Sequence, residues 1–167
     1  MSEHPLLQAD EILRALLEAN VRFVLIGGLA SQVHGSPSLT GDVDICFALD
    51  GENLRRLSDA LASMAAIRRG VGATINAPID HRALRLGDVF ALSTRFGDLD
   101  LLAHPDPRLD FELLAGRSID AEIFGQTVKV ASLADLIDMK RAAGRPKDRI
   151  ELEILGALRE ELDRRDG

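Results

Sequence analysis

The chain has 167 residues, of which 46% are hydrophobic, and its formal net charge is −7 at pH 7. A chain of this size can bury one core without disulfides or metal staples, so we expect a single domain over residues 1–167, with a core at about 8–131 and C-terminal helices at about 132–165. The negative net charge argues against a large, positively charged surface that binds nucleic acid.

The cysteine count and the hydropathy of the sequence bear on disulfide bonds, membrane insertion and cellular location. Cys46 is the only cysteine, so we expect no disulfide and no disulfide-linked partner, and we interpret its side chain as a small buried hydrophobe. No stretch reaches the length of a transmembrane helix, and the short acidic N-terminus lacks the apolar segment of a signal peptide. We therefore expect a cytoplasmic protein with no membrane partner.

Apolar periodicity and turn residues predict an alternation of helices and strands. The expected elements are, in chain order, a helix at 9–18, a strand at 21–26, a short helix at 29–34, a strand at 40–47, a helix at 50–64, a connection over the active face at 67–87, a hairpin of strands 89–96 and 99–103, a second hairpin of strands 121–124 and 127–130, and helices at 132–140 and 150–162. Gly97 and Asp98 are expected to turn the first hairpin, and Gly125 and Gln126 the second. The strand at 99–103 is expected to lie antiparallel beside the strand at 40–47.

Two aspartates lie within the apolar strand at 40–47. Because side chains alternate between the faces of a strand, Asp42 and Asp44 project from one face while Val43 and Ile45 take the other. Two carboxylates this close repel each other and raise each other's pKa, so a site that keeps both ionised usually holds Mg²⁺ or Mn²⁺ bridging to substrate phosphate oxygens. The pair therefore indicates phosphoryl or nucleotidyl chemistry.

A glycine pair, Gly27 and Gly28, ends the strand at 21–26, and Asp42 follows fourteen residues after Gly28. Glycines let the backbone approach a phosphate closely, and the free N–H groups at the start of the next helix favour an anion. An ordinary tight turn has the same sequence pattern. The Asp-x-Asp strand at this distance favours the phosphate-binding interpretation.

These motifs resemble the nucleotidyltransferase superfamily typified by DNA polymerase beta, and within it the small bacterial nucleotidyltransferases that include toxins of toxin–antitoxin pairs. That family has an apolar strand, Gly-Gly or Gly-Ser, a short helix, an Asp-x-Asp strand and a third acidic residue on a later strand. The matching parts of this chain are residues 24–28, residues 42–45, the Gly-x-x-Asp strand ending at Asp100, the helix at 132–140 and the Gly-Arg-x-Lys-Asp turn at 144–148. The resemblance spans roughly residues 21–155.

The resemblance implies an α+β nucleotidyltransferase fold, with a mixed, mainly antiparallel sheet flanked by helices and a short C-terminal helical extension. It implies a metal-dependent enzyme that moves an NMP from an NTP to an acceptor hydroxyl and releases pyrophosphate. In this expectation Asp42, Asp44 and Asp100 are the catalytic residues and hold Mg²⁺ or Mn²⁺. The expected nucleotide-binding residues are Gly27, Gly28, Ser31, Thr40 and Lys140.

The resemblance leaves the acceptor open among a tRNA end, a protein hydroxyl and a small molecule such as an aminoglycoside, and its toxin members imply a cognate antitoxin as a partner. One position departs from the family. Members often have Arg four residues before the first Asp, whereas this chain has Ser38 there. Because serine carries no charge, we expect the negative charge of the triphosphate to be neutralised by Lys140, together with Arg145 and Lys147 in the turn after its helix.

Two other hypotheses stay open. The missing arginine is compatible with a catalytically degenerate member of the fold that binds a nucleotide or a partner without turnover. The other is a phosphohydrolase with Asp42 as a covalent nucleophile, although Asp-x-Asp phosphatases place the pair on the first strand and lack the glycine pair. The third carboxylate also has two candidates, because Asp98 and Asp100 lie on one strand face. The neighbouring Gly97 makes Asp98 a turn residue in this interpretation, which assigns the role to Asp100.

Overall fold

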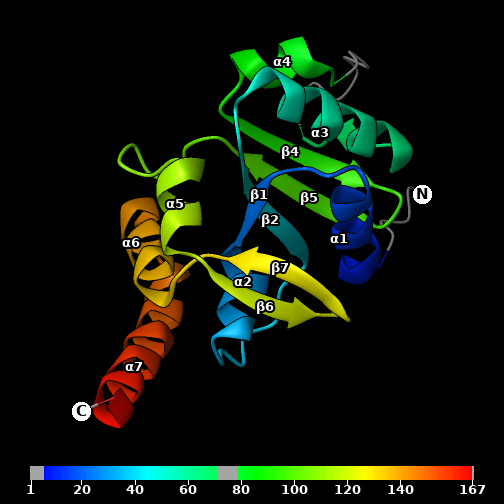
Figure 1. Cartoon of the computed structure of the whole chain (residues 1–167). Helices are drawn as coiled ribbons and strands as arrows, with labels where there is room; N and C mark the ends of the chain where they lie inside the picture. Colours follow the sequence, from blue (N-terminus) through cyan, green and yellow to red (C-terminus); the bar gives the residue numbers. More distant parts are fainter. Residues whose placement is uncertain (1–5, 71–78, 167) are drawn as a thin grey trace.

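The computed structural model describes residues 6–70 and 79–166. Part of the connection expected at 67–87, namely 71–78, lies outside the described residues. Within the described residues, a seven-stranded mixed sheet is flanked by helices (Figure 1). This confirms the α+β architecture expected from the sequence.

The sheet is mixed and mainly antiparallel, as expected. Its strands are β1 (Phe23–Ile26), β2 (Asp42–Phe47), β3 (Ile67–Arg68), β4 (Val89–Thr94), β5 (Gly97–Leu102), β6 (Ile119–Ile123) and β7 (Gln126–Val130). They lie in the order β3-β4-β5-β2-β1-β7-β6. Two neighbouring pairs, β2 with β5 and β1 with β7, are parallel, and the other four are antiparallel.

The direction of β5 corrects one expectation from the sequence. β5 runs parallel to β2 and aligns Asp100 with Asp44, whereas an antiparallel neighbour was expected. The antiparallel neighbour of β5 is β4, and that of β2 is β1. Each lies on the side of its strand away from the β2–β5 pair. The chain reaches β5 from β2 through α3 and the β4 hairpin, and such a long connection permits parallel pairing.

The turn of the β4–β5 hairpin also lies earlier than expected. Arg95 and Phe96 form it, whereas Gly97 and Asp98 are the first residues of β5. Gly97 has a φ of +116°, and a β-carbon there would lie 3.0 Å from the backbone of Leu7. Glycine is thus required by conformation and by packing at the start of the strand.

The second hairpin forms close to where the sequence placed it. Its turn residues are Phe124 and Gly125, one position before the expected pair. Both have positive φ, 52° and 77°. Positive φ at both central residues is typical of the tight turns that match the twist of a hairpin.

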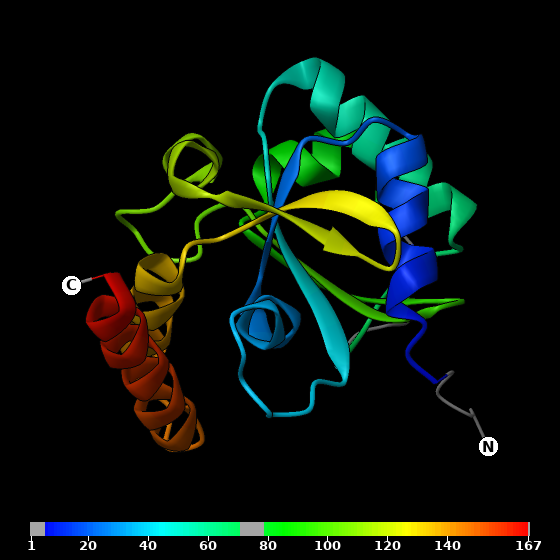
Figure 2. The same cartoon turned by 60° about the horizontal axis from the view of Figure 1, so that its bottom comes forward.

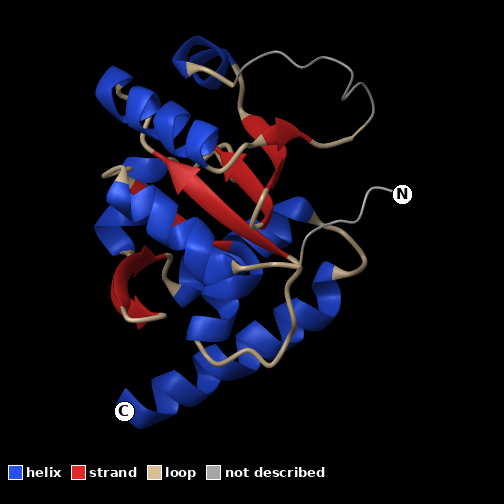
Figure 3. Cartoon of the chain, turned by 90° about the vertical axis from the view of Figure 1, so that its right-hand side faces the viewer, coloured by secondary structure: helices blue, strands red, loops and turns tan. Residues whose placement is uncertain are grey.

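The helices are α1 (Ala9–Glu18), α2 (Gly27–Val33), α3 (Gly51–Ser63), α4 (His81–Leu86), α5 (Phe111–Arg117), α6 (Leu133–Ala143) and α7 (Asp148–Asp166). Figures 1 and 2 show α1 and α3 side by side against the sheet, with α4 next to α3. The two views place α2, α6 and α7 near the opposite side of the sheet. Figure 3 shows the same arrangement from the side.

Strand β2 has the alternation that its sequence predicts. Val43 and Ile45 are fully buried in the core, whereas Asp42 and Asp44 are half-buried on the other face. Cys46 is also fully buried, which confirms its interpretation as a small hydrophobe. Burial, with smaller contributions from the charges of Asp110 and Asp88, raises the pKa of the Cys46 thiol to about 12. The thiol is therefore protonated and unreactive at neutral pH.

The C-terminal helices pack mainly on each other. Ser132 caps α6 as predicted, with its hydroxyl oxygen accepting a hydrogen bond from the Asp135 N–H at 3.2 Å. Helix α7 begins two residues before the predicted start and buries Leu155, while Ile150, expected on its apolar face, is 69% exposed. None of the helices in residues 6–70 and 79–166 is long and apolar enough to cross a membrane.

Candidate active site

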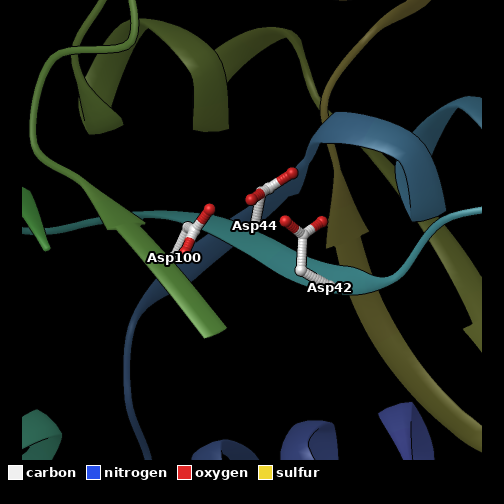
Figure 4. Close-up of side chains that lie close together, drawn as sticks. All are labelled: Asp42, Asp44 and Asp100. Carbon is white, nitrogen blue, oxygen red and sulfur yellow. The ribbon is translucent and has the colours of Figure 1, made fainter. Parts of the chain in front are cut away.

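Three carboxylates meet on the exposed face of β2 and β5. The parallel register sets Asp44 beside Asp100, and period two places Asp42 on the same face (Figure 4). One ligand oxygen from each of the three lies within 4.8 Å of the others. All three are oxygen donors, which suit a hard divalent cation such as Mg²⁺ or Mn²⁺. The structure thus brings together the three residues expected to hold the metal, which we call the acidic triad.

Burial and mutual repulsion make the ionised form of the acidic triad unfavourable. Burial, followed by the charges of Asp42 and Asp100, raises the pKa of Asp44 to about 7. Burial, followed by the charge of Asp100, also raises the pKa of Asp42. A bound cation would offset both effects, because it stabilises the ionised form of each carboxyl group.

The two glycines begin α2 directly, where the sequence suggested a separate turn before a helix at residue 29. Gly27 has a φ of +72°, and a β-carbon there would collide with the carboxylate of Asp44. A β-carbon on Gly28 would lie 2.8 Å from Thr40 Cβ and Oγ1. The glycine pair is therefore needed for α2 to start against β2 and its preceding loop, and it lies in contact distance of the acidic triad.

The two hydroxyl residues expected to bind nucleotide have local partners. Ser31 is buried, and its Oγ donates to the carbonyl oxygen of Gly27 at 3.2 Å. Thr40 Oγ1 lies 3.1 Å from the carbonyl oxygen of Asp42 and 3.3 Å from its Oδ1. Ser31 thus holds the first turn of α2, and Thr40 holds the start of β2.

All of the expected site residues line one pocket of about 730 Å³. The expected nucleotide-binding residues in it are Gly27, Gly28, Ser31, Thr40 and Lys140, and the acidic triad completes the set. Its apolar lining includes Leu39, Val89, Leu102, Pro105, Leu136, Met139 and Ile150. The pocket therefore combines polar and charged residues with apolar side chains, as small-molecule sites usually do.

Lys140 and the turn after its helix form an ion-pair network around a buried carboxylate. Lys140 Nζ lies 3.2 Å from Asp148 Oδ1, and Arg145 Nε lies 2.8 Å from Asp148 Oδ2. Burial alone would raise the pKa of Asp148, but hydrogen bonds from Arg145 and Lys140 together lower it. Asp148 thus neutralises part of the positive charge of Lys140 and Arg145, which were expected to bind the triphosphate. The same ion pairs join α6 to α7.

Ser38, at the position where the family often has arginine, is bound to an acidic residue. Its Oγ donates to Glu151 Oε2 at 2.6 Å, and Ser36 Oγ donates to Glu151 Oε1 at 3.0 Å. Glu151 also lines the pocket. The sequence pattern gave no signal for Glu151, because more than a hundred residues separate it from Ser38.

Arg69 is a second residue near the site that the motifs did not indicate. Its Nη2 donates to Asp100 Oδ1 at 2.8 Å, and its Nη1 lies 3.5 Å from Asp98 Oδ2. Asp98 also accepts a hydrogen bond from Ser93 Oγ at 3.2 Å. Asp98 therefore lies in β5 with its own partners, rather than in a turn, and Asp100 is the member of the pair that joins the acidic triad.

The fold is similar to solved nucleotidyltransferase structures. LnuA, a lincosamide antibiotic adenylyltransferase solved with lincomycin bound, matches with a TM-score of 0.62 at 13% identity, over 92% of this chain and 99% of that chain. The antibiotic-resistance factor ANT(2'')-Ia, in complex with adenylyl-2''-tobramycin, matches with a TM-score of 0.55 at 19% identity, over 95% and 97%. A nucleotidyltransferase-like protein from Paracoccidioides brasiliensis matches with a TM-score of 0.59 at 19% identity, over 92% and 77%.

Comparisons with protein-family models and with curated proteins gave no match. The structural likenesses, at identities below 20%, establish the fold. The chain has the nucleotidyltransferase fold that its glycine pair and Asp-x-Asp strand predicted.

Proposed function

We propose that the protein is a nucleotidyltransferase that uses Mg²⁺ or Mn²⁺ to move an NMP from an NTP to a hydroxyl group of a small-molecule acceptor, with release of pyrophosphate. The observation that carries this proposal is the acidic triad, gathered beside Gly27 and Gly28 in one pocket. The nucleotidyltransferase fold supports it.

The residues present fit a divalent cation. The donors are all carboxylate oxygens within 4.8 Å of one another, and burial together with the charges of Asp42 and Asp100 raises the pKa of Asp44. When bound there, the cation would favour the ionised carboxylates and stabilise the phosphate oxygens of the NTP in the transition state.

The chain's own residues have distinct roles in this proposal. Gly27 and Gly28 let α2 start against Asp44 and Thr40, which brings the backbone of its first turn beside the acidic triad, and Lys140 contributes positive charge to the pocket. The acceptor oxygen attacks the α-phosphorus, the bond from the α-phosphorus to the bridging oxygen of the leaving pyrophosphate breaks, and Asp100 takes the proton from the acceptor hydroxyl.

A small molecule is the acceptor that the observations favour. The pocket has the volume typical of small-molecule sites, and its walls include apolar side chains close to the acidic triad. The structures of LnuA and ANT(2'')-Ia contain lincomycin and an adenylylated tobramycin. The net charge of −7 is unfavourable for a tRNA acceptor. A protein acceptor, a cognate antitoxin and a cytoplasmic location stay predictions from the sequence.

A nucleotide-binding protein without turnover is the second candidate, and it is favoured by one observation. Ser38 stands where the family often has arginine and is bound to Glu151, so an acidic group faces the pocket there. The phosphohydrolase hypothesis has less support, because Asp42 and Asp44 lie on β2, after the glycine pair.

The two candidates differ in turnover. The protein is incubated with each α-labelled NTP and Mg²⁺ or Mn²⁺, together with lincomycin, tobramycin or total tRNA, and labelled acceptor and pyrophosphate are measured. Transfer that disappears in Asp44→Asn supports the enzyme. Saturable NTP binding with no transfer and no pyrophosphate supports the second candidate, and the absence of both binding and transfer would contradict each of them.

A further inference from the structure

We infer that Arg69 is a positioning residue, which fixes the carboxylate of Asp100 so that the acidic triad is already arranged to receive a cation. The inference deepens the proposed function and rests on its metal site. Its basis is a chain of contacts that runs from the edge of the sheet to Asp100 on the face opposite the core.

Arg69 is itself held in place by β4. It directly follows the edge strand β3, and its backbone N–H donates to the carbonyl oxygen of Ala91 at 2.9 Å. Its Nη1 donates to the carbonyl oxygen of Leu92 at 2.8 Å. The side chain is 28% exposed. Main chain and guanidinium are therefore both attached to β4, so the guanidinium reaches Asp98 and Asp100 on β5 in a defined geometry.

The guanidinium holds the carboxylate of Asp100 at one oxygen. Nη2 donates to Oδ1 at 2.8 Å, and one carboxylate oxygen of Asp100 lies within 4.8 Å of oxygens of Asp42 and Asp44. Arg69 does not belong to the lining of the pocket, whereas Asp100 does. Arg69 therefore acts on the site through Asp100, in the way that outer partners orient the ligands of metal sites.

Asp98 completes the arrangement on the side away from the pocket. Its Oδ2 lies 3.5 Å from Arg69 Nη1, and its Oδ1 accepts from Ser93 at 3.2 Å. Asp98 is thus a second anion for the same guanidinium, and the planar fork of arginine can contact both carboxylates where a lysine ammonium is a single point charge. The interpretation explains why two acidic residues alternate on β5 although only Asp100 joins the triad.

The sign of the effect on metal affinity separates positioning from simple charge. Arg69 is a cation close to the site, so removal of its charge alone would tighten the binding of Mn²⁺. Loss of positioning would weaken it, because Asp100 would be free to turn away from Asp42 and Asp44. We therefore expect Arg69→Met to bind Mn²⁺ about tenfold more weakly than the parent, as is typical when an outer partner of a metal ligand is removed.

The test measures Mn²⁺ binding by electron paramagnetic resonance in the absence of nucleotide, at a temperature where circular dichroism shows every variant folded. Arg69→Lys keeps the charge without the fork and should also weaken binding, by less than Arg69→Met does. The control variant is Arg56→Met, which removes an exposed arginine that pairs with Glu52 on α3.

The outcomes distinguish this inference from the proposed function. Weakened Mn²⁺ binding in Arg69→Met, with parent-like binding in Arg56→Met, supports the positioning role. Equal or tighter binding in Arg69→Met overturns it and leaves the proposed enzyme intact. Should Arg69→Met fail to fold, parent-like binding in Arg69→Lys overturns the inference and weaker binding supports it. A parent protein that binds no Mn²⁺ overturns the metal site and the inference together.

Discussion

Asp44 carries the main electrostatic cost of the acidic triad. Its pKa is raised from an ordinary 3.8 to about 7, chiefly by burial and then by Asp42 and Asp100. Between these two values the folded protein binds a proton that the unfolded chain has released. The stabilising effect of that proton is fully present below about pH 4 and is lost as the pH rises to about 7.

We therefore expect the metal-free protein to lose stability relative to Asp44→Asn as the pH rises from about 4 to 7. The slope of the difference should approach, at most, about 1.4 kcal/mol per pH unit. Urea unfolding in a chelating buffer at several pH values measures it. Parallel profiles for the two proteins would contradict the raised pKa, and saturating Mg²⁺ should flatten the slope of the parent alone.

Ser38 is the residue whose replacement tests the missing arginine. An arginine at this position would be close to Glu151, which now accepts from Ser38 at 2.6 Å. The new guanidinium would pair with Glu151, so Ser38→Arg alone should tighten NTP binding only slightly. The double variant Ser38→Arg with Glu151→Gln should tighten it by about tenfold, the worth of a hydrogen bond to a charged group.

Calorimetric titration of NTP in the presence of Mg²⁺ compares these proteins. Glu151→Gln alone is the matched control, because it removes the acid without adding a cation. Equal affinity in the single and double arginine variants would mean that Glu151 does not compete for the guanidinium. A loss of affinity in both would place the triphosphate away from Ser38.

At the scale of secondary-structure elements, local sequence patterns were enough to predict the strands that carry the acidic residues. Period two placed Asp42 and Asp44 on one face because the alternation depends on β2 alone. The hairpin of β4 and β5 was also predictable from adjacent strands. The parallel pairing of β5 with β2 was not, because it depends on which side of the hairpin faces β2. The contacts of Arg69 with Asp100 and of Glu151 with Ser38 could not be predicted from local patterns either, since they join distant segments.

The junction of α6 and α7 makes Lys140 both a structural and a candidate binding residue. We expect Lys140→Ala to weaken NTP binding by about tenfold, the worth of a hydrogen bond to a charged group. The melting temperature of Lys140→Ala should fall only slightly, because Asp148 loses Lys140 but keeps Arg145 as a partner. Titration with NTP and thermal unfolding measure the two effects.

Lys129→Ala is the matched control for that prediction. Lys129 forms an exposed ion pair with Asp120 and does not line the pocket that contains the acidic triad. The control variant should bind NTP like the parent. Parent-like NTP binding in Lys140→Ala would restrict Lys140 to joining the two helices, and the triphosphate charge would then have to be met elsewhere.

For the whole molecule, the central claim is that the acidic triad and the glycine pair form one site for a nucleotide and a metal ion. The pocket joins β1, β2 and β5 to α2, α6 and α7, so a ligand held there contacts both the sheet and the C-terminal helices. Only the folded chain assembles these parts, so ligands that bind there together stabilise it against unfolding.

The most direct test of this claim is the melting temperature with millimolar NTP, with Mg²⁺, and with both. The predicted result is a rise with both that exceeds the sum of the separate rises, because each ligand supplies charge that the other needs. Asp42→Asn and Asp44→Asn should fold, lose this excess and lose transfer activity. Additive shifts in the parent, or an excess retained in both variants, would contradict a shared site for nucleotide and metal.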